Sequence, residues 1–339
     1  MVVIHSNKVA WLARFPGIAL SVSIATVATF IGRSIPVIGA PIICIVIGVA
    51  IAATRKPAER FRPGIETSSK LILQISVVVL GSQLSLKEIV KVGFSSLLVM
   101  LGTLTVCLAG AFWIGKWLGI VGDLRTLIGV GTSICGASAI AAVTPIIGAA
   151  SVDVAYAIST IFLFNMTAVL TFPFLGHLLG LSQHSFGLFA GTAINDMSSV
   201  VAASTTYGSV AASYAIVVKL TRTMLIIPIS LGLATLERRK HMADGPKPQV
   251  RVVRLIPWYL IGFLVVASAN SVGLIPRGIH HDLVEISIFL IAIALAAIGL
   301  STDVAGFRRT GHRPLLLGGI LWILVSTTSL LLQYLTHSL

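Results

Sequence analysis

Charged residues are scarce in this chain of 339 residues. Lys, Arg, Asp and Glu together make up 10% of it, against about a quarter in a typical soluble domain. Acids are the scarcest, with 11 Asp and Glu against 24 Lys and Arg, while 56% of the residues are hydrophobic. Soluble globular, disordered and fibrous proteins do not combine these features. The composition therefore indicates an all-α polytopic membrane protein.

Cysteines and catalytic motifs are also few. Cys44, Cys107 and Cys135 all lie inside apolar runs and form neither a disulfide framework nor a metal-binding spacing. The chain has no nucleotide-binding glycine loop and no HExxH or Ser-His-Asp pattern, which argues against ATP-driven transport by this chain and against an enzyme. His280 and His281 form a pair that is more typical of a solvated loop than of a metal site. We expect no cofactor and no metal.

Gaps between charged residues predict the membrane spans. About 20 apolar residues cross the hydrocarbon core, where an ionised side chain costs several kcal/mol. On this rule the chain has about 11 transmembrane helices, in a single transporter domain of residues 1–339 with a cytoplasmic loop at 237–254. The predicted spans are 15–31, 37–53, 71–85, 94–118, 127–149, 154–179, 186–203, 210–236, 255–275, 286–300 and 314–335.

The distribution of Lys and Arg predicts the orientation. A cytoplasmic N terminus places 18 of the 24 cations on the cytoplasmic side and four on the opposite side, so the C terminus is expected to be periplasmic or extracellular. The remaining two lie within predicted span 210–236. The alternative that the first apolar run is a signal peptide is weaker, because this run exceeds about 7 to 15 residues and lacks a clear cleavage site. The basic charge thus reflects contact with the lipid bilayer, and we expect no nucleic-acid partner.

Two internal similarities suggest repeats, which are common in transporters. Residues 78–98 align with 296–316 at an offset of 218, and the two copies would run in opposite directions, as in an inverted repeat. Residues 131–142 (GTSICGASAIAA) align with 191–202 (GTAINDMSSVVA) at an offset of 60. Chance similarity among helix-packing Gly and Ser residues is the alternative. In the predicted topology this second pair would be parallel, which an inverted architecture does not explain.

The second pair of segments carries the candidate binding residues. Small and polar residues in mid-span weaken a helix, and they are tolerated where the freed backbone groups are buried in protein or line a cavity. We therefore predict two discontinuous helices, whose N-terminal ends suit anions and whose C-terminal ends suit cations. The candidate substrate-binding residues of these breaks are Thr132, Ser133, Cys135, Gly136, Ser138, Thr192, Asn195 and Ser198.

Three charges lie in the long apolar middle of the chain. Asp196 is the only charged residue between Asp153 and Lys219, and an isolated intramembrane acid commonly carries a proton or an ion. Lys219 and Arg222, three residues apart, share one helix face, and Arg suits oxyanions through its forked donors. We predict that these two cations bind the anion and that Asp196, with Asn195, serves ion coupling. The alternatives are that Asp196 only neutralises the cations and that Arg222 extends to the membrane surface.

These segments resemble a known family. The chain resembles the YeiH-type sulfate exporter family of bacterial inner-membrane proteins. The resemblance lies in the stretch 128–142, the segment 191–203, the K-x-x-R of Lys219 and Arg222 and the span pattern. That family is grouped with the cation/proton antiporters and anion transporters, so the resemblance implies an inverted-repeat fold with a movable core and discontinuous helices. Residues 133–179 are also similar to the broken helix and following helix of bile-acid-type sodium symporters.

The expected function is secondary active transport of a small anion. The resemblance implies sulfate or a related sulfur oxyanion or sulfonate, with export by alternating access coupled to H+ or Na+, in the bacterial inner membrane. The alternatives are an anion channel and a bile-acid-type symporter of organic anions with sodium. A more distant alternative is an intramembrane enzyme. A homodimer is a possible assembly.

Overall fold

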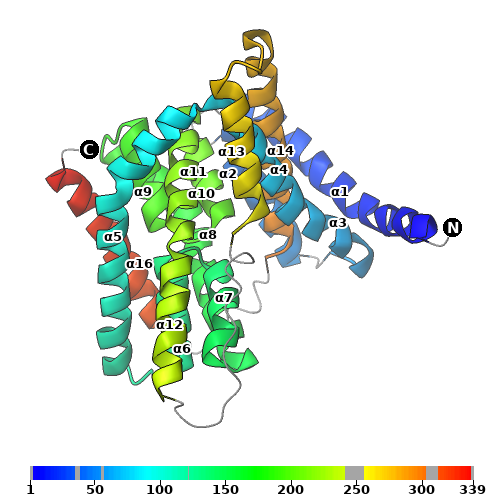
Figure 1. Ribbon diagram of the computed structural model, residues 1–339. Helices are drawn as coiled ribbons and strands as arrows, with labels where there is room; N and C mark the ends of the chain where they lie inside the picture. Colours follow the sequence, from blue (N-terminus) through cyan, green and yellow to red (C-terminus); the bar gives the residue numbers. More distant parts are fainter. Residues whose placement is uncertain are drawn as a thin grey trace. The chain divides into compact units, whose positions relative to one another are not determined.

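Helices make up all the regular structure of the described residues. The computed structural model describes residues 3–34, 39–54, 57–120, 122–240, 256–302 and 312–336 (Figure 1), and the predicted all-α class is confirmed for them. The chain groups into two compact units, Met1–Leu86 with Tyr259–Ala305 and Lys87–Trp258 with Gly306–Leu339. Of the predicted loop 237–254, helix α12 covers the first residues up to Lys240, and residues 241–254 lie outside the described ones.

Seven helical segments of the described residues are long and apolar enough to cross a membrane. They are Ala13–Gly32, Glu59–Gln83, Leu86–Trp117, Ser151–Leu178, Ser209–Leu236, His280–Leu300 and His312–Leu335. Two shorter apolar helices, Ala40–Thr54 and Trp258–Ser271, coincide with predicted spans 37–53 and 255–275. The exact count of 11 spans is not confirmed, and the main reason lies in predicted spans 127–149 and 186–203.

The first unit is built around close helix packing. Its elements are α1 (Val3–Ser34), α2 (Gly39–Thr54), η1 (Glu59–Phe61), α3 (Arg62–Thr67), the π-helical turn η2 (Ser68–Ile72), α4 (Leu73–Leu80), η3 (Gly81–Gln83), α13 (Trp258–Ser271), η5 (Arg277–Ile279) and α14 (His280–Leu300). Helix α14 packs along α2, and Gly48 and Gly299 meet at the contact. A Cβ on Gly299 would lie 2.6 Å from the carbonyl oxygen of Ile45, so this approach requires glycine.

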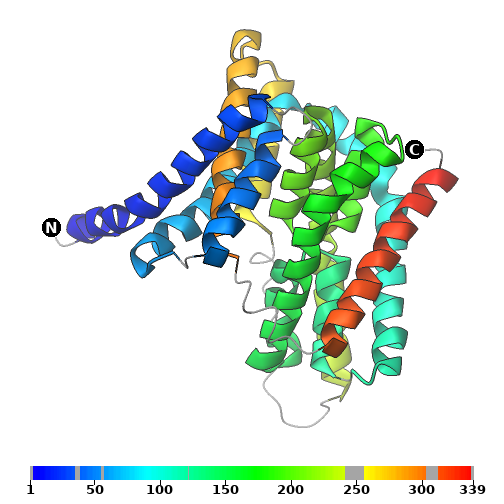
Figure 2. The same cartoon turned by 180° about the vertical axis from the view of Figure 1, so that it is seen from behind.

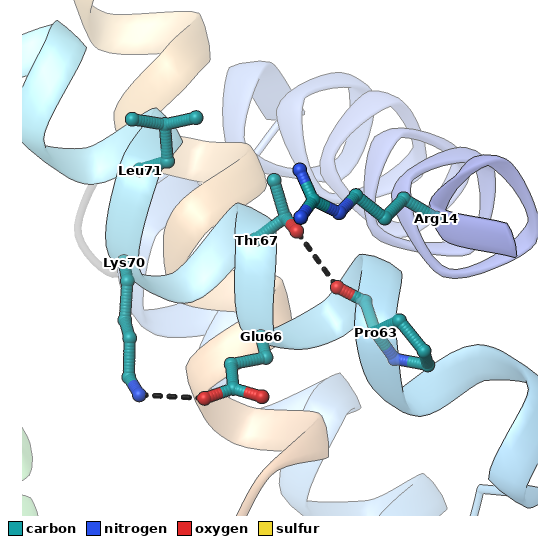
Figure 3. Close-up of a pocket in the computed structure, with 6 residues that line it drawn as sticks. All are labelled: Arg14, Pro63, Glu66, Thr67, Lys70 and Leu71. Carbon is teal, nitrogen blue, oxygen red and sulfur yellow. Dashed lines mark hydrogen bonds and ion pairs between the residues drawn. The ribbon is translucent and has the colours of Figure 1, made fainter. Parts of the chain in front are cut away.

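A shallow groove opens in the first unit, beside α1, α3 and η2. It measures about 320 Å³ and is lined by Arg14, Pro63, Glu66, Thr67, Lys70 and Leu71 (Figure 3). Lys70 donates to Glu66 over 2.7 Å, and Thr67 donates to the carbonyl of Pro63. None of the predicted binding residues lies in this groove.

The second unit contains all the predicted binding residues. Its longer helices are α5 (Leu86–Trp117), α8 (Ser151–Leu178), α11 (Ser209–Met224), α12 (Ile226–Lys240) and α16 (His312–Leu335). Between them lie four helices of 11 residues each: α6 (Asp123–Ser133), α7 (Ala137–Ile147), α9 (Gln183–Ala193) and α10 (Met197–Tyr207). All four boundaries of the α6–α7 pair recur in the α9–α10 pair at an offset of 60. The structure thus extends the short repeat seen in the sequence to two complete helix pairs.

Each pair is a hairpin and not one interrupted span. In the first hairpin (123–147), a Cβ on Gly131 of α6 would touch the side chain of Ile140 of α7 at 3.0 Å. In the second hairpin (183–207), the rings of Phe186 and Tyr207 stack with centroids 3.8 Å apart, although these residues lie at opposite ends of the pair in sequence. The second contact joins the far ends of its pair, so α9 and α10 run side by side in opposite directions. The first contact shows that the chain also turns back between α6 and α7.

This geometry corrects the expectation that 127–149 and 186–203 each cross the membrane. A helix of 11 residues is about 16 Å long, roughly half the thickness of the hydrocarbon core. The predicted breaks are confirmed, because the helices end and restart at 134–136 and 194–196. Figures 1 and 2 agree in showing α6 and α7 at one end of the second unit and α9 and α10 at the other. The predicted inverted repeat at offset 218 stays a prediction, since part of its second copy lies outside the described residues.

Candidate functional site

The tips of the two hairpins meet in the interior of the second unit. We call residues 134–136 the first tip and residues 194–196 the second tip. A Cβ on Gly136 would lie 3.5 Å from the Cβ of Asp196 and 3.5 Å from Ile161 of α8. Gly136 has φ +66°, a conformation that other residues rarely adopt, and its N–H donates to the carbonyl of Gly131. Glycine thus allows the reversal of the chain at this point, where the two tips lie in van der Waals contact.

Lys219 joins the two tips. It projects from α11 and is fully buried. Its Nζ donates to the carbonyl oxygen of Ile134 and to that of Ile194, each over 2.8 Å. These carbonyls belong to the C-terminal ends of α6 and α9, where the helix supplies no hydrogen-bond partner and the dipole is negative. The ammonium therefore satisfies one backbone acceptor from each hairpin.

Arg222 repeats this arrangement one helical turn along α11. It is also fully buried. Its Nε donates to the carbonyl of Ser133 over 2.8 Å, its Nη1 donates to the carbonyl of Thr192, and its Nη2 lies 3.5 Å from the carbonyl oxygen of Thr132. Hydrogen bonds that involve a charged group contribute about 1.5 to 3 kcal/mol each. The predicted placement of both cations on one face of α11 fits, and Arg222 does not extend to the membrane surface.

Asp196 caps the second half of its hairpin. Its carboxylate accepts from the backbone N–H of Ser199 over 2.7 Å and from the hydroxyl groups of Ser198 and Ser199. It is therefore the N-cap of α10. Among the described residues, no ion pair within 4.0 Å joins Asp196 to Lys219 or Arg222. Direct neutralisation of the two cations by Asp196, one of the alternatives from the sequence, is not seen.

The other predicted residues divide between buried and accessible positions. Ser138 is exposed and Ser198 is partly exposed. The buried positions are Thr132, Ser133, Cys135, Thr192 and Asn195. The Thr192 hydroxyl lies 2.7 Å from that of Ser329 on α16, and the Asn195 N–H donates to Oδ1 of Asn165. The Oδ1 atom of Asn195 has no partner among the described residues. The structure thus brings both predicted clusters together at one meeting point.

Comparison with known proteins shows the family. Residues 16–318 match the sequence model of the family described as Conserved hypothetical protein 698, which covers well over half of the chain. The chain belongs to the conserved hypothetical protein 698 family. Among its relatives, the UPF0324 membrane protein of Streptococcus pyogenes serotype M6 is 41% identical over 330 residues, which are 95% of this chain and 97% of the relative. The UPF0324 membrane protein of Clostridium tetani is 35% identical, over 94% of this chain and 96% of the relative.

Membership of the conserved hypothetical protein 698 family supports a membrane protein and names no substrate. The relatives are named membrane proteins, and the matched residues include both hairpins and α11. The resemblance to sulfate exporters is not repeated in these names, so the substrate stays a prediction.

Sequence reasoning missed three polar residues that support the hairpins in this family member. Asn165 of α8 binds the second tip, and Ser329 of α16 binds Thr192 and accepts from Gln333. Asn165 had a usable signal, because it is the only amide in the apolar segment 154–179. Ser329 had none, since isolated serines are common in membrane helices.

Proposed function

We propose that this protein is a secondary active transporter of a small anion, with sulfate or a related sulfur oxyanion or sulfonate as the expected substrate. The observation that carries the proposal is the pair of fully buried cations, Lys219 and Arg222, at the meeting point of the hairpin tips. Among the residues that the structure describes, no carboxylate lies within 4.0 Å of either cation. A buried charge is expensive, and its persistence in an apolar helix indicates a functional site.

The electrostatics of the tips favour an anion. Lys219 and Arg222 contribute two positive charges, and Asp196 contributes one negative charge that its serines already solvate. At an effective dielectric constant of about 20, an anion roughly 8 Å from one such cation gains about 2 kcal/mol. The net field therefore attracts an anion even though the donor atoms of both cations are engaged by backbone carbonyls.

The first turn of α7 offers the direct contacts that an anion needs. No side chain caps this N terminus, and Ala137 and Ser138 are exposed. Backbone N–H groups and the positive dipole end are available here, and the hydroxyls of Ser138 and Ser198 are accessible on the two hairpins. We propose that these groups hold the anion, while Lys219 and Arg222 hold the tips and supply the field.

Alternating access would use the hairpins as the moving parts. Because the two hairpins enter the second unit from opposite ends and meet at their tips, displacement of one tip would open the meeting point from one end only. The proposal has three further parts. The anion is exported, its transport is coupled to H+ or Na+ through Asp196, and the protein lies in the bacterial inner membrane with its N terminus inside.

Two measurements test this function. Purified protein is screened by thermal unfolding against sulfate, sulfite, thiosulfate, taurine and small carboxylates, since a ligand at 100 times its Kd stabilises the folded state by about 2.7 kcal/mol. Proteoliposomes then report the flux of the stabilising anion. A saturable, gradient-driven flux supports the transporter, and a conductance without saturation identifies a channel.

Arg222→Gln provides the residue-level test, with the exposed Arg60→Gln as its matched control. We expect Arg222→Gln to lose the anion-induced shift and the flux, whereas Arg60→Gln keeps both. Unchanged uptake by Arg222→Gln would show that the anion site lies elsewhere.

A further inference from the structure

The ammonium of Lys219 sits where a metal cation would be expected. Two carbonyl oxygens from the C-terminal ends of α6 and α9 face one point, which Nζ occupies at 2.8 Å from each. Carbonyl oxygens at helix C-termini are the groups that hold Na+ in transporters with discontinuous helices. The buried Oδ1 of Asn195, adjacent in sequence to Ile194, is a further oxygen in the same tip, and it has no hydrogen-bond partner in the described part of the chain.

We propose that Lys219 is a resident cation: its ammonium replaces a coupling Na+ at the hairpin tips, so the chain assembles and works without sodium. This inference rests on the proposed function for its role in transport. Of the two coupling ions considered there, H+ and Na+, it leaves H+. The inference also has a structural part: a cation occupies this position, and the chain itself supplies it. This part depends only on the two hydrogen bonds of Lys219.

Charge at the tips explains why sodium is excluded. Arg222 is the neighbouring cation on α11, and Asp196 is the one carboxylate of the two tips. A sodium ion beside Lys219 would be a third positive charge against a single negative one. Like charges at such short range in a buried site repel each other strongly.

Removal of the ammonium should turn the position into a cation site. In Lys219→Ala the carbonyls of Ile134 and Ile194 lose their donor and remain buried, and the deleted side chain leaves room for a small cation. Methylammonium carries the same donor group, and Na+ binds the same oxygens. Choline is the control cation, because it has no N–H donor and is too large for the vacated space.

The experiment measures thermal unfolding of the purified full-length chain in NaCl, methylammonium chloride and choline chloride at equal concentration. We expect the wild type to unfold at the same temperature in all three salts. We expect Lys219→Ala to unfold at a lower temperature in choline chloride and to regain about 2 °C or more in methylammonium or sodium. The matched control is Lys91→Ala, an exposed lysine of α5, which should respond to none of the cations.

Two results would overturn the proposal. Selective stabilisation of the wild type by sodium would show that the chain binds sodium although Lys219 is present. A Lys219→Ala protein that is indifferent to all three salts would show that the ammonium does not stand in for a cation. If Lys219→Ala does not fold, Lys219→Ser takes its place, because it also removes the charge and vacates the space beside the two carbonyls.

The outcome is separable from that of the proposed function. Every arm contains chloride as the only anion, so a failure to find a transported anion leaves this result unaffected. Conversely, a sodium-stabilised wild type that still transports an anion would refute the resident cation and leave the transporter standing.

Discussion

Replacement of Asp196 separates a structural cap from a proton-carrying group. Asp196→Ala removes the acceptor of the Ser199 N–H, which costs about 1 kcal/mol for a typical N-cap. It also leaves the buried Ser199 hydroxyl without this acceptor, at about 1 kcal/mol, and removes a negative charge from a helix N terminus, at about 0.3 to 1 kcal/mol. The total is about 2 to 3 kcal/mol.

Asp196→Asn keeps the cap and removes only the charge. Its amide oxygen can still accept from the Ser199 N–H, so we expect a loss of about 0.5 kcal/mol. In thermal unfolding of a chain of this size, about 1 kcal/mol corresponds to roughly 2 °C, which separates the alanine variant, at about 4 to 6 °C, from the asparagine variant, at about 1 °C.

The control is Asp153→Ala. Asp153 lies in the first turn of α8, where no side chain makes a capping hydrogen bond, so only the dipole interaction is lost. Equal destabilisation by Asp196→Asn and Asp196→Ala would refute the cap, because the charge would then matter more than the acceptor. If Asp196 also serves ion coupling, Asp196→Asn should fold almost as the wild type does and lose gradient-driven flux.

Two further perturbations test the packing of each unit. Gly299→Ala would place a Cβ 2.6 Å from the carbonyl oxygen of Ile45, so α14 must shift from α2, and we expect thermal unfolding to show a loss of about 1 to 3 kcal/mol in stability. The control is Gly232→Ala in α12, where a Cβ meets nothing within 4 Å. This substitution should instead stabilise the fold by up to about 1 kcal/mol. If both substitutions have the same sign, the close approach is not the cause. Ser329→Ala removes the buried contact with Thr192 and should cost about 1 to 3 kcal/mol of folding stability. A double-mutant cycle with Thr192→Val that gives no coupling energy would show that this contact does not contribute to stability.

The positions of the helix breaks could be predicted from sequence. Clusters of Gly, Ser and Thr in apolar segments weaken helices, and both breaks fall inside such clusters, at 134–136 and 194–196. The offset of 60 between the clusters also holds for the boundaries of the helices on either side. Local composition was sufficient here because a break depends on a few adjacent residues.

The reversal of the chain at each break could not be predicted from charge. The segments 150–153, 180–185 and 204–209 contain no Lys or Arg. The count of cations on each side is therefore identical whether 127–149 and 186–203 cross the membrane or turn back. The hairpins also remove the difficulty with parallel copies, since Figures 1 and 2 show the two pairs at opposite ends of the second unit.

The side chains of the site were predictable, and their partners were not. Lys219, Arg222 and Asp196 were identified because a charge in an apolar segment is rare. Their main contacts are backbone carbonyls and N–H groups, which every non-proline residue carries and which leave no mark in a sequence. The sequence therefore singled out these three charged residues, whereas their contacts with the tips could be seen only in the fold.

The bridging of both tips by α11 has a consequence for biosynthesis. Ile134 precedes Lys219 by 85 residues, so at about 5 to 20 residues per second the ribosome needs roughly 4 to 17 s to supply the partner of the Ile134 carbonyl. During that interval the first hairpin exists with its helix end unsatisfied, and water or the insertion machinery must bind it. Both hairpins are thus completed in a single late event, when α11 enters the membrane, and a nascent chain that stops before Lys219 carries two open tips.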